Sequence, residues 1–146
     1  YITGMDATLA VDIPVVRNVS ASLTASYILQ KAIDKTDSKS ESYNKQLPYT
    51  PDNSGSAMLM LKTPWVNVGY SLTACGERYS MGSNASEYRI APYWAHSVTV
   101  SRGFIMRQYR LSLSASLLNI TNEQYEIIQY YPMPGRNWQI TATLTL

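Results

Sequence analysis

The sequence predicts an all-β protein, an antiparallel transmembrane β-barrel segment of about seven strands. Three observations predict this class. Stretches of about ten residues alternate between apolar side chains and small hydroxyl side chains, as in a strand with lipid on one side. The connections between these stretches alternate between short and long. No apolar run approaches the ~18 residues of a membrane-crossing helix.

The composition indicates that only a small part of the protein surface faces water. Charged residues make up 15% of the chain, below the roughly one quarter of ordinary soluble domains. The net charge of +2 is too small to indicate a nucleic-acid partner. Among the aromatic residues, 12 Tyr and 3 Trp outnumber the single Phe. Aromatic rings with a polar tip suit an apolar–water boundary, although a carbohydrate- or protein-binding surface would also explain them.

Each of the first four predicted strands rests on its own alternation. In residues 4–13 and 19–30 the odd-numbered positions are apolar, and in 19–30 the even-numbered ones are mostly Ser and Thr. Residues 55–62 follow, although Met58 and Met60 blur the alternation. In 66–79 the apolar side chains instead occupy even-numbered positions. A polar face of small hydroxyl groups does not suit the dry interior of a soluble sandwich.

The last three strands repeat the pattern. Residues 93–102 set Trp94, Val98 and Val100 against hydroxyl side chains. Residues 109–117 alternate between apolar side chains and Arg or Ser. Residues 137–146 alternate without a break, from Trp138 to Leu146 on one face. No helix is predicted.

The connections indicate how the strands are arranged. The short ones are 14–18, 63–65 and 102–108, with the last turning around Gly103, and the long ones are 31–53, 80–92 and 118–136. Outer-membrane barrels have short periplasmic turns and long outer loops, so the C-terminus is expected in the periplasm. Seven strands are an odd number, whereas bacterial single-chain barrels normally have an even number. Because the chain also begins at Tyr1 in mid-pattern, we expect it to be part of a larger barrel.

Several short motifs appear in an order known from one protein family. They are LPYTP at 47–51, PWVNVGY at 64–70, GERY at 76–79, NITNEQYE at 119–126 and YPMPGR at 131–136. With them the chain resembles the C-terminal barrel portion of a TonB-dependent outer-membrane receptor. The resemblance is to the cobalamin- and siderophore-receptor type common in Bacteroidota. It covers residues from about 47 to the end, and the chain departs from the pattern by ending on Leu146 instead of Phe.

The resemblance implies a 22-stranded barrel closed by an N-terminal plug, of which residues 1–146 would be the C-terminal part. It implies uptake of a scarce nutrient, such as an iron–siderophore or cobalamin, across the outer membrane of a Gram-negative bacterium. The implied partners are outer-membrane lipid, the rest of the barrel and its plug, a small nutrient ligand, and a TonB-type energy-coupling protein that acts through the plug. We expect no enzyme activity and no cofactor.

The candidate ligand contacts lie at the rim. Glu77, Arg78 and Tyr79 follow a strand and precede a long loop, so they fit either ligand contact or a plain charge cluster with an interface tyrosine. Arg136 fits ligand contact or an ion pair with Glu126. The polar loop at 31–46 fits a ligand-facing lid or a solvated loop.

The family motifs also supply candidate structural residues. Asn119 and Asn122 are expected to tie down the backbone at a strand end, and Tyr125 to anchor the outer rim. Pro132 and Pro134 fix φ, and Gly135 permits φ > 0, which together predict a rigid turn.

His96 and Cys75 carry little functional signal. His96 is the only histidine, and no Cys, His, Asp or Glu group has metal-ligand spacing. An outer-membrane hydrolase would need a serine and an acid beside His96, and the many serines make that pattern unspecific. Cys75 is the single cysteine and is expected on the lumen side as a small buried residue.

Two other interpretations of the whole chain remain open. A small complete barrel with a structural or adhesive role would require an eighth strand within residues 31–53. A soluble all-β binding module would be folded and monomeric in plain buffer, without detergent.

Overall fold

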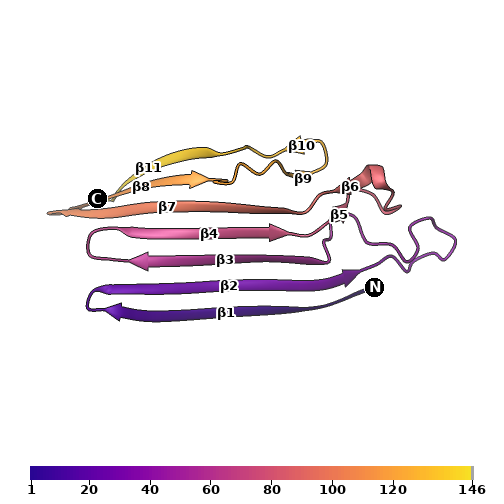
Figure 1. Ribbon diagram of the computed structural model, residues 1–146, viewed down its shortest axis with the longest axis horizontal. Helices are drawn as coiled ribbons and strands as arrows, with labels where there is room; N and C mark the ends of the chain where they lie inside the picture. Colours follow the sequence, from indigo (N-terminus) through magenta and orange to yellow (C-terminus); the bar gives the residue numbers. More distant parts are fainter. Residues whose placement is uncertain (146) are drawn as a thin grey trace.

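The computed structural model describes residues 1–145 and confirms the all-β antiparallel class. Seven strands form one sheet, and they lie side by side in the order in which they occur along the chain (Figure 1). Each inner strand therefore pairs with the sheet strand before it and the sheet strand after it. In spatial order these strands are β1 (Ile2–Val16), β2 (Val19–Ala32), β3 (Asn53–Lys62), β4 (Asn67–Cys75), β7 (Tyr93–Met106), β8 (Tyr109–Leu118) and β11 (Asn137–Thr145). Leu146, the predicted end of the last strand, lies outside the described residues.

Two small ribbons and one short helical turn sit in the long connections. The ribbons are β5 (Arg78–Tyr79) with β6 (Arg89–Ile90), and β9 (Glu126–Ile128) with β10 (Tyr131–Pro132). The prediction of no helix missed a single 3-10 turn, η1 (Ser86–Tyr88). No helix within residues 1–145 is long and apolar enough to cross a bilayer.

Three predicted boundaries are wrong. β1 continues past Pro14, with a register irregularity there, because an edge strand tolerates a proline that cannot donate a ladder hydrogen bond. β4 ends at Cys75 instead of Tyr79. The Gly76 N–H still donates to the Asn53 carbonyl at 2.9 Å, in the same register as the ladder, and after it the chain pairs instead with β6 through β5. β7 runs through Gly103 to Met106, so the turn there is Arg107–Gln108.

Backbone angles explain the last of these errors. No glycine in residues 1–145 has a positive φ, and Gly103 pairs with Ser112 inside the ladder. The left-handed residue is Arg107 instead, with φ of 51°. Asn18 has the same role in the β1–β2 turn, with φ of 67°, as expected for an asparagine.

The predicted tight turn after β3 is present. The Thr63 hydroxyl donates to the Val66 carbonyl at 2.6 Å and accepts the Val66 N–H at 3.0 Å. Pro64 lies between them and has a fixed φ, so the chain reverses within four residues.

The two faces of the sheet differ in chemistry. The apolar face carries rows of residues that are directly opposite one another, such as Leu23, Leu59, Tyr70, Val98, Leu117 and Trp138. The hydroxyl face carries rows such as Thr8, Ser26, Ser56 and Thr73. Neighbouring hydroxyls bond across strands, Ser26 to Ser56 at 3.0 Å and Thr99 to Ser116 at 2.9 Å.

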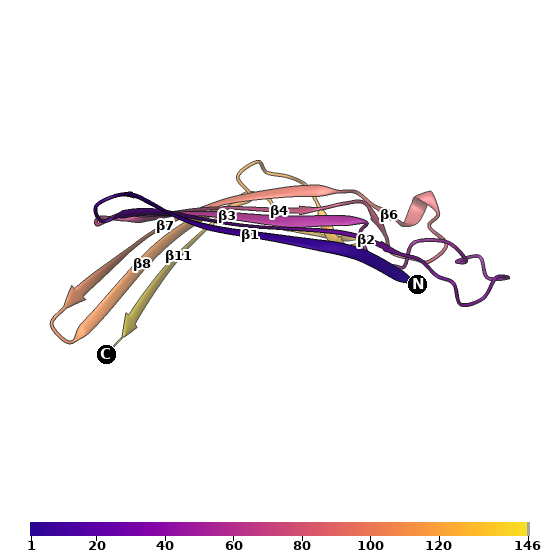
Figure 2. The same cartoon turned by 90° about the horizontal axis from the view of Figure 1, so that it is seen from below.

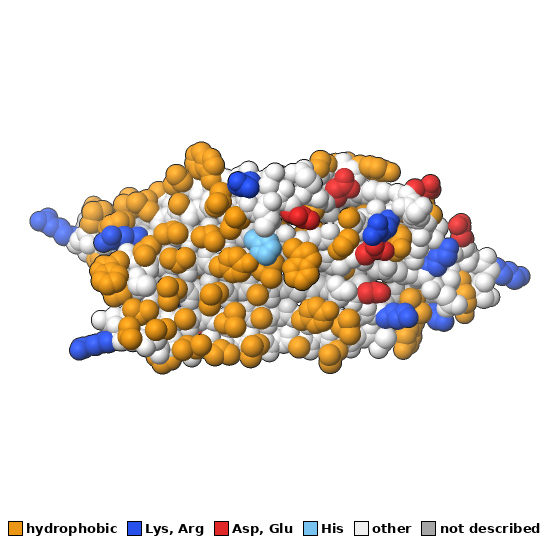
Figure 3. Space-filling view, in the orientation of Figure 1, with side chains coloured by type: hydrophobic (Ala, Val, Ile, Leu, Met, Phe, Trp, Pro, Cys, Tyr) orange, Lys and Arg blue, Asp and Glu red, His pale blue; other side chains and the backbone are white. Residues whose placement is uncertain are grey.

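The sheet forms a single curved layer (Figure 2), and it has almost no core. Apart from glycines, the only buried residues within 1–145 are Ala32, Ile90, Tyr93, Arg78 and Asn119, and all five lie at the long-loop end. Apolar side chains cover much of the face seen in Figure 3, the acidic groups gather toward the long loops, and Lys and Arg side chains lie at both ends. Even large side chains are open to solvent, with Trp138 73% exposed and Leu9 55% exposed.

Both edges of the sheet are unpaired. β1 and β11 each pair with one strand only within residues 1–145, and they do not pair with each other. The eighth strand that a small complete barrel would need is not found in its predicted place. Between β2 and β3 the described chain makes a single bridge, Ile33 with Gln46.

Candidate functional site

Three long connections meet at one end of the sheet (Figure 1). We call them the first loop (33–52), the second loop (76–92) and the third loop (119–136). The first and second loops are bonded to each other through Gln46, whose N–H donates to Asn84 Oδ1 at 2.7 Å and whose carbonyl accepts from Asn84 Nδ2 at 3.0 Å. Lys45 Nζ adds a bond to the Ser83 carbonyl at 2.7 Å. Part of the predicted 31–46 loop is therefore fixed to its neighbour.

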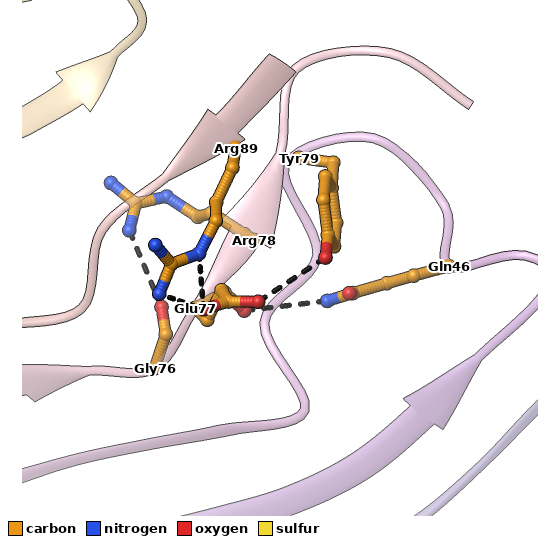
Figure 4. Close-up of polar contacts among 6 residues, drawn as sticks. All are labelled: Gln46, Gly76, Glu77, Arg78, Tyr79 and Arg89. Atoms are coloured by element: carbon orange, nitrogen blue, oxygen red, sulfur yellow. Dashed lines mark hydrogen bonds and ion pairs between the residues drawn. The ribbon is translucent and has the colours of Figure 1, made fainter. Parts of the chain in front are cut away.

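The three residues predicted at the rim, Glu77, Arg78 and Tyr79, lie at the start of the second loop, and their side chains have different surroundings (Figure 4). Glu77 forms an ion pair with Arg89 at 2.5 Å, and the Tyr79 hydroxyl donates to Glu77 at 3.2 Å. The hydrogen bond from Arg89 holds the pKa of Glu77 below its usual value. Both partners of the ion pair are well exposed, so solvent screens the attraction and the pair contributes little to stability.

Arg78 is buried, with 3% of its surface exposed. Its Nη2 donates to the carbonyls of Glu126 at 2.5 Å and Ile127 at 3.3 Å, both in β9 of the third loop. Its guanidinium also lies 5.6 Å from the centre of the Tyr93 ring. Arg78 therefore joins the second loop to the third. The alternating pattern gave no signal for this contact, because the partners are 48 and 49 residues away.

Asn119 organises the start of the third loop. It is 5% exposed and takes a left-handed φ of 50°. Its side chain accepts the Glu123 N–H at 2.9 Å and donates to the carbonyls of Glu123 at 2.9 Å and Pro134 at 3.2 Å. The side-chain amide of Asn119 therefore stabilises the first turn of the third loop and also bonds it to Pro134 near the end of that loop.

Asn122 and Gly135 make a second closure of the same loop. Asn122 has φ of 56°, and its Oδ1 accepts the Arg136 N–H at 2.8 Å. A Cβ on Gly135 would lie 2.7 Å from that oxygen. The expectation that Gly135 uses φ > 0 is wrong. A glycine fits here because the Asn122 side chain approaches closely.

The remaining motif residues lie over the hydroxyl face or on the rim. Tyr125 stacks on Tyr93 with ring centres 4.2 Å apart, which brings the third loop over that face. Pro132 belongs to β10. Arg136 donates to the Ile120 carbonyl at 2.9 Å. The expected ion pair with Glu126 does not form, since the single ion pair within residues 1–145 is Glu77–Arg89.

A cavity of about 510 Å³ opens where the loops meet the hydroxyl face. We call it the outer pocket; its lining is Tyr49 and Pro51 of the first loop, Cys75 and Tyr93 at strand ends, Arg78, and Ile127 and Ile128 of the third loop. Of the residues predicted as ligand contacts, only Arg78 lines it. The other residues that line the pocket were not predicted as ligand contacts, because they come from segments that are far apart in the sequence. Tyr49 and Pro51 do belong to the LPYTP motif.

His96 lies on the apolar face, away from this pocket, and its Nδ1 is 2.6 Å from the Tyr70 hydroxyl. Cys75 is partly buried on the hydroxyl face, and Arg78 Nη1 contacts its Sγ at 3.5 Å. Over residues 1–145 no group of three or more Cys, His, Asp or Glu side chains converges as metal ligands would.

The sequence matches no protein-family model and no curated protein. Among solved structures, the fold is similar to part of the ferric yersiniabactin uptake receptor FyuA from Yersinia pestis, with a TM-score of 0.59 at 15% sequence identity. The alignment covers 99% of this chain and 21% of that receptor, so the chain spans about a fifth of the receptor's length. At this identity the similarity concerns the fold, and the chain shares the fold of one segment of an uptake receptor.

Proposed function

We propose that the chain forms part of the wall of a TonB-dependent outer-membrane receptor that takes up a scarce nutrient, such as an iron–siderophore or cobalamin. The observation that carries the proposal is the exposed apolar face of a single-layer sheet. A soluble sheet buries such a face against a second layer. A bilayer covers it equally well, and the hydroxyl face then lines a polar lumen.

Aromatic side chains on the apolar face support a bilayer of ordinary thickness. Trp94 and Phe104 lie ten residues apart on the same face of β7. At about 3.4 Å per residue and a tilt of about 40°, this separation spans roughly 26 Å across the membrane. Outer-membrane barrels have an apolar band about 25 Å tall between two aromatic girdles. Tyr27 and Trp138 are further exposed aromatics on the same face.

The chain layout supports one orientation. The short turns face the periplasm, the three long loops face outward, and the C-terminus is periplasmic. Loops would capture the nutrient, and an energy-coupling protein of the inner membrane would rearrange a plug in the lumen. The present chain contributes wall and loops.

The unpaired edges support membership in a larger barrel. β1 and β11 run in the same direction, so closing these strands on themselves would require a parallel pair. Bacterial barrels of this kind are antiparallel with an even strand number. Residues 1–146 are therefore proposed as the C-terminal part of a barrel whose other strands and plug belong to the rest of the protein.

Uptake by cells tests the proposal. Cells that make the full-length receptor containing this chain are supplied with labelled ferric siderophores or cobalamin, with and without a protonophore. Saturable uptake that the protonophore abolishes is expected. Equal accumulation in cells that lack the receptor would contradict the proposal.

A further inference from the structure

The outer pocket has a composition suited to an apolar ring. Its walls are mainly aliphatic and aromatic, with Tyr49, Pro51, Ile127 and Ile128 supplied by loops. The volume of about 510 Å³ lies within the roughly 300–1,000 Å³ of small-molecule sites. No carboxylate lines it.

The pocket also holds a positive charge without a carboxylate partner. Arg78 donates to the carbonyls of Gly76, Glu126 and Ile127 and to Cys75 Sγ. The one ion pair of residues 1–145 joins two other side chains. Carbonyl dipoles and the Tyr93 ring solvate the guanidinium but leave its charge in place. Because the guanidinium is shielded from water, its charge attracts anions and repels cations more strongly than a charge on the open surface would.

The walls are fixed before any ligand arrives. The Tyr49 N–H donates to the Tyr79 carbonyl at 2.7 Å, which holds the first loop to the second. Ser80 bonds Gln129, and Gln129 Nε2 donates to the Glu87 carbonyl at 2.6 Å, which holds the second loop to the third. Together with Arg78, these contacts keep the pocket open without help from a ligand, as in most small-molecule sites.

We propose that the outer pocket binds an apolar ring that bears a negative charge, as in an aromatic carboxylate, and that it discriminates against the matching cation. The inference rests on the proposed function, because it assigns the chemistry of one part of the molecule that the receptor captures. The charge of Arg78 selects the sign, and the apolar walls take up the ring.

The test uses the full-length receptor in lipid nanodiscs, with salicylate as the anionic probe and benzylammonium as the matched cation. Binding is measured by equilibrium dialysis against empty nanodiscs. Ile128→Trp fills the pocket from a side chain that is already half exposed. Ile105→Trp is the control, because it makes the same change at an exposed residue outside the pocket.

We expect saturable salicylate binding that is at least about tenfold tighter than benzylammonium binding. Ile128→Trp should weaken it at least about tenfold, and Ile105→Trp should leave it within about twofold. Equal or tighter binding of benzylammonium, or unchanged binding in Ile128→Trp, would overturn the inference. The inference would also be overturned if salicylate did not bind and Ile128→Trp lowered the melting temperature of the receptor. That result would mean that another part of the receptor already fills the pocket and clashes with the added ring.

A separate readout distinguishes this inference from the proposed function. Heat-modifiable migration on gels reports whether the receptor has inserted as a folded barrel. A folded receptor that fails to bind salicylate overturns only the pocket chemistry. A receptor that does not insert into lipid overturns the proposed function as well.

Discussion

Arg78→Met removes the buried arginine contact between the second loop and the third while keeping a long side chain in the buried space. The variant loses the two hydrogen bonds from Nη2 to the carbonyls of Glu126 and Ile127. A hydrogen bond to a charged group contributes roughly 1.5–3 kcal/mol. Taking the lower value for each, local opening of the third loop should become easier by about 3 kcal/mol, or about 100-fold.

Hydrogen exchange measures this opening directly, because protected amides exchange through local opening. The Tyr130 N–H bonds Glu126 and the Met133 N–H bonds the Tyr125 carbonyl, so both report on the third loop. Arg89→Met is the matched control, since its ion pair is exposed and screened by solvent and contributes little to stability. The assigned role of Arg78 would be refuted if the third-loop amides exchanged at similar rates in the two variants. It would also be refuted if Arg78→Met accelerated exchange in the strands as much as in the third loop.

Three further predictions concern stability and pH. Asn119→Ala should lower the free energy of unfolding in urea by about 1–3 kcal/mol, because the change removes three hydrogen bonds of a buried side chain. Gly55→Ala should destabilise by about 1–3 kcal/mol, because its Cβ would lie 3.0 Å from a backbone oxygen, whereas Gly103→Ala meets nothing closer than 4.0 Å and should be near neutral. Hydrogen bonds, the largest from the Ser42 hydroxyl and others from Thr36, lower the pKa of Asp34 to about 2. The stabilising effect of its carboxylate is therefore complete above the ordinary value of 3.8 and is lost as the pH falls toward 2.

The outcomes that would contradict these three predictions are distinct. An unchanged urea midpoint for Asn119→Ala would mean that its hydrogen bonds form equally well with water. Equal effects at Gly55 and Gly103 would mean that the close backbone approach is not real. For Asp34, carbon-detected NMR should show the pKa rise toward 3.8 in Ser42→Ala, and an unchanged titration would reject the hydroxyl as its cause.

The strands could be predicted because a two-residue period places each side chain on a definite face. Their ends were harder to predict, because they depend on particular backbone contacts. Gly103 looked like a turn residue, yet it lies in β7 and Arg107 turns the chain. The predicted strand through Tyr79 stops at Cys75. Neither difference has a signal in the alternation of apolar and polar residues.

The candidate site was predictable only in part. Asn119 and Asn122 could be identified as turn residues because short amide side chains bond nearby backbone groups. The burial of Arg78 could not, because its partners come from a loop that folds back over the hydroxyl face. The outer pocket likewise depends on three loops that meet only in the folded chain.

The most direct test of the central claim asks which face of the sheet contacts lipid. Leu72 and Thr73 are adjacent in β4 and point to opposite faces. Each is replaced in turn by a spin-labelled cysteine in the full-length receptor, with Cys75→Ala as background, in lipid vesicles. We predict that oxygen, which concentrates in lipid, relaxes the label at 72, and that a water-soluble nickel chelate relaxes the label at 73. Equal accessibility at both positions, or the reverse pattern, would contradict the account.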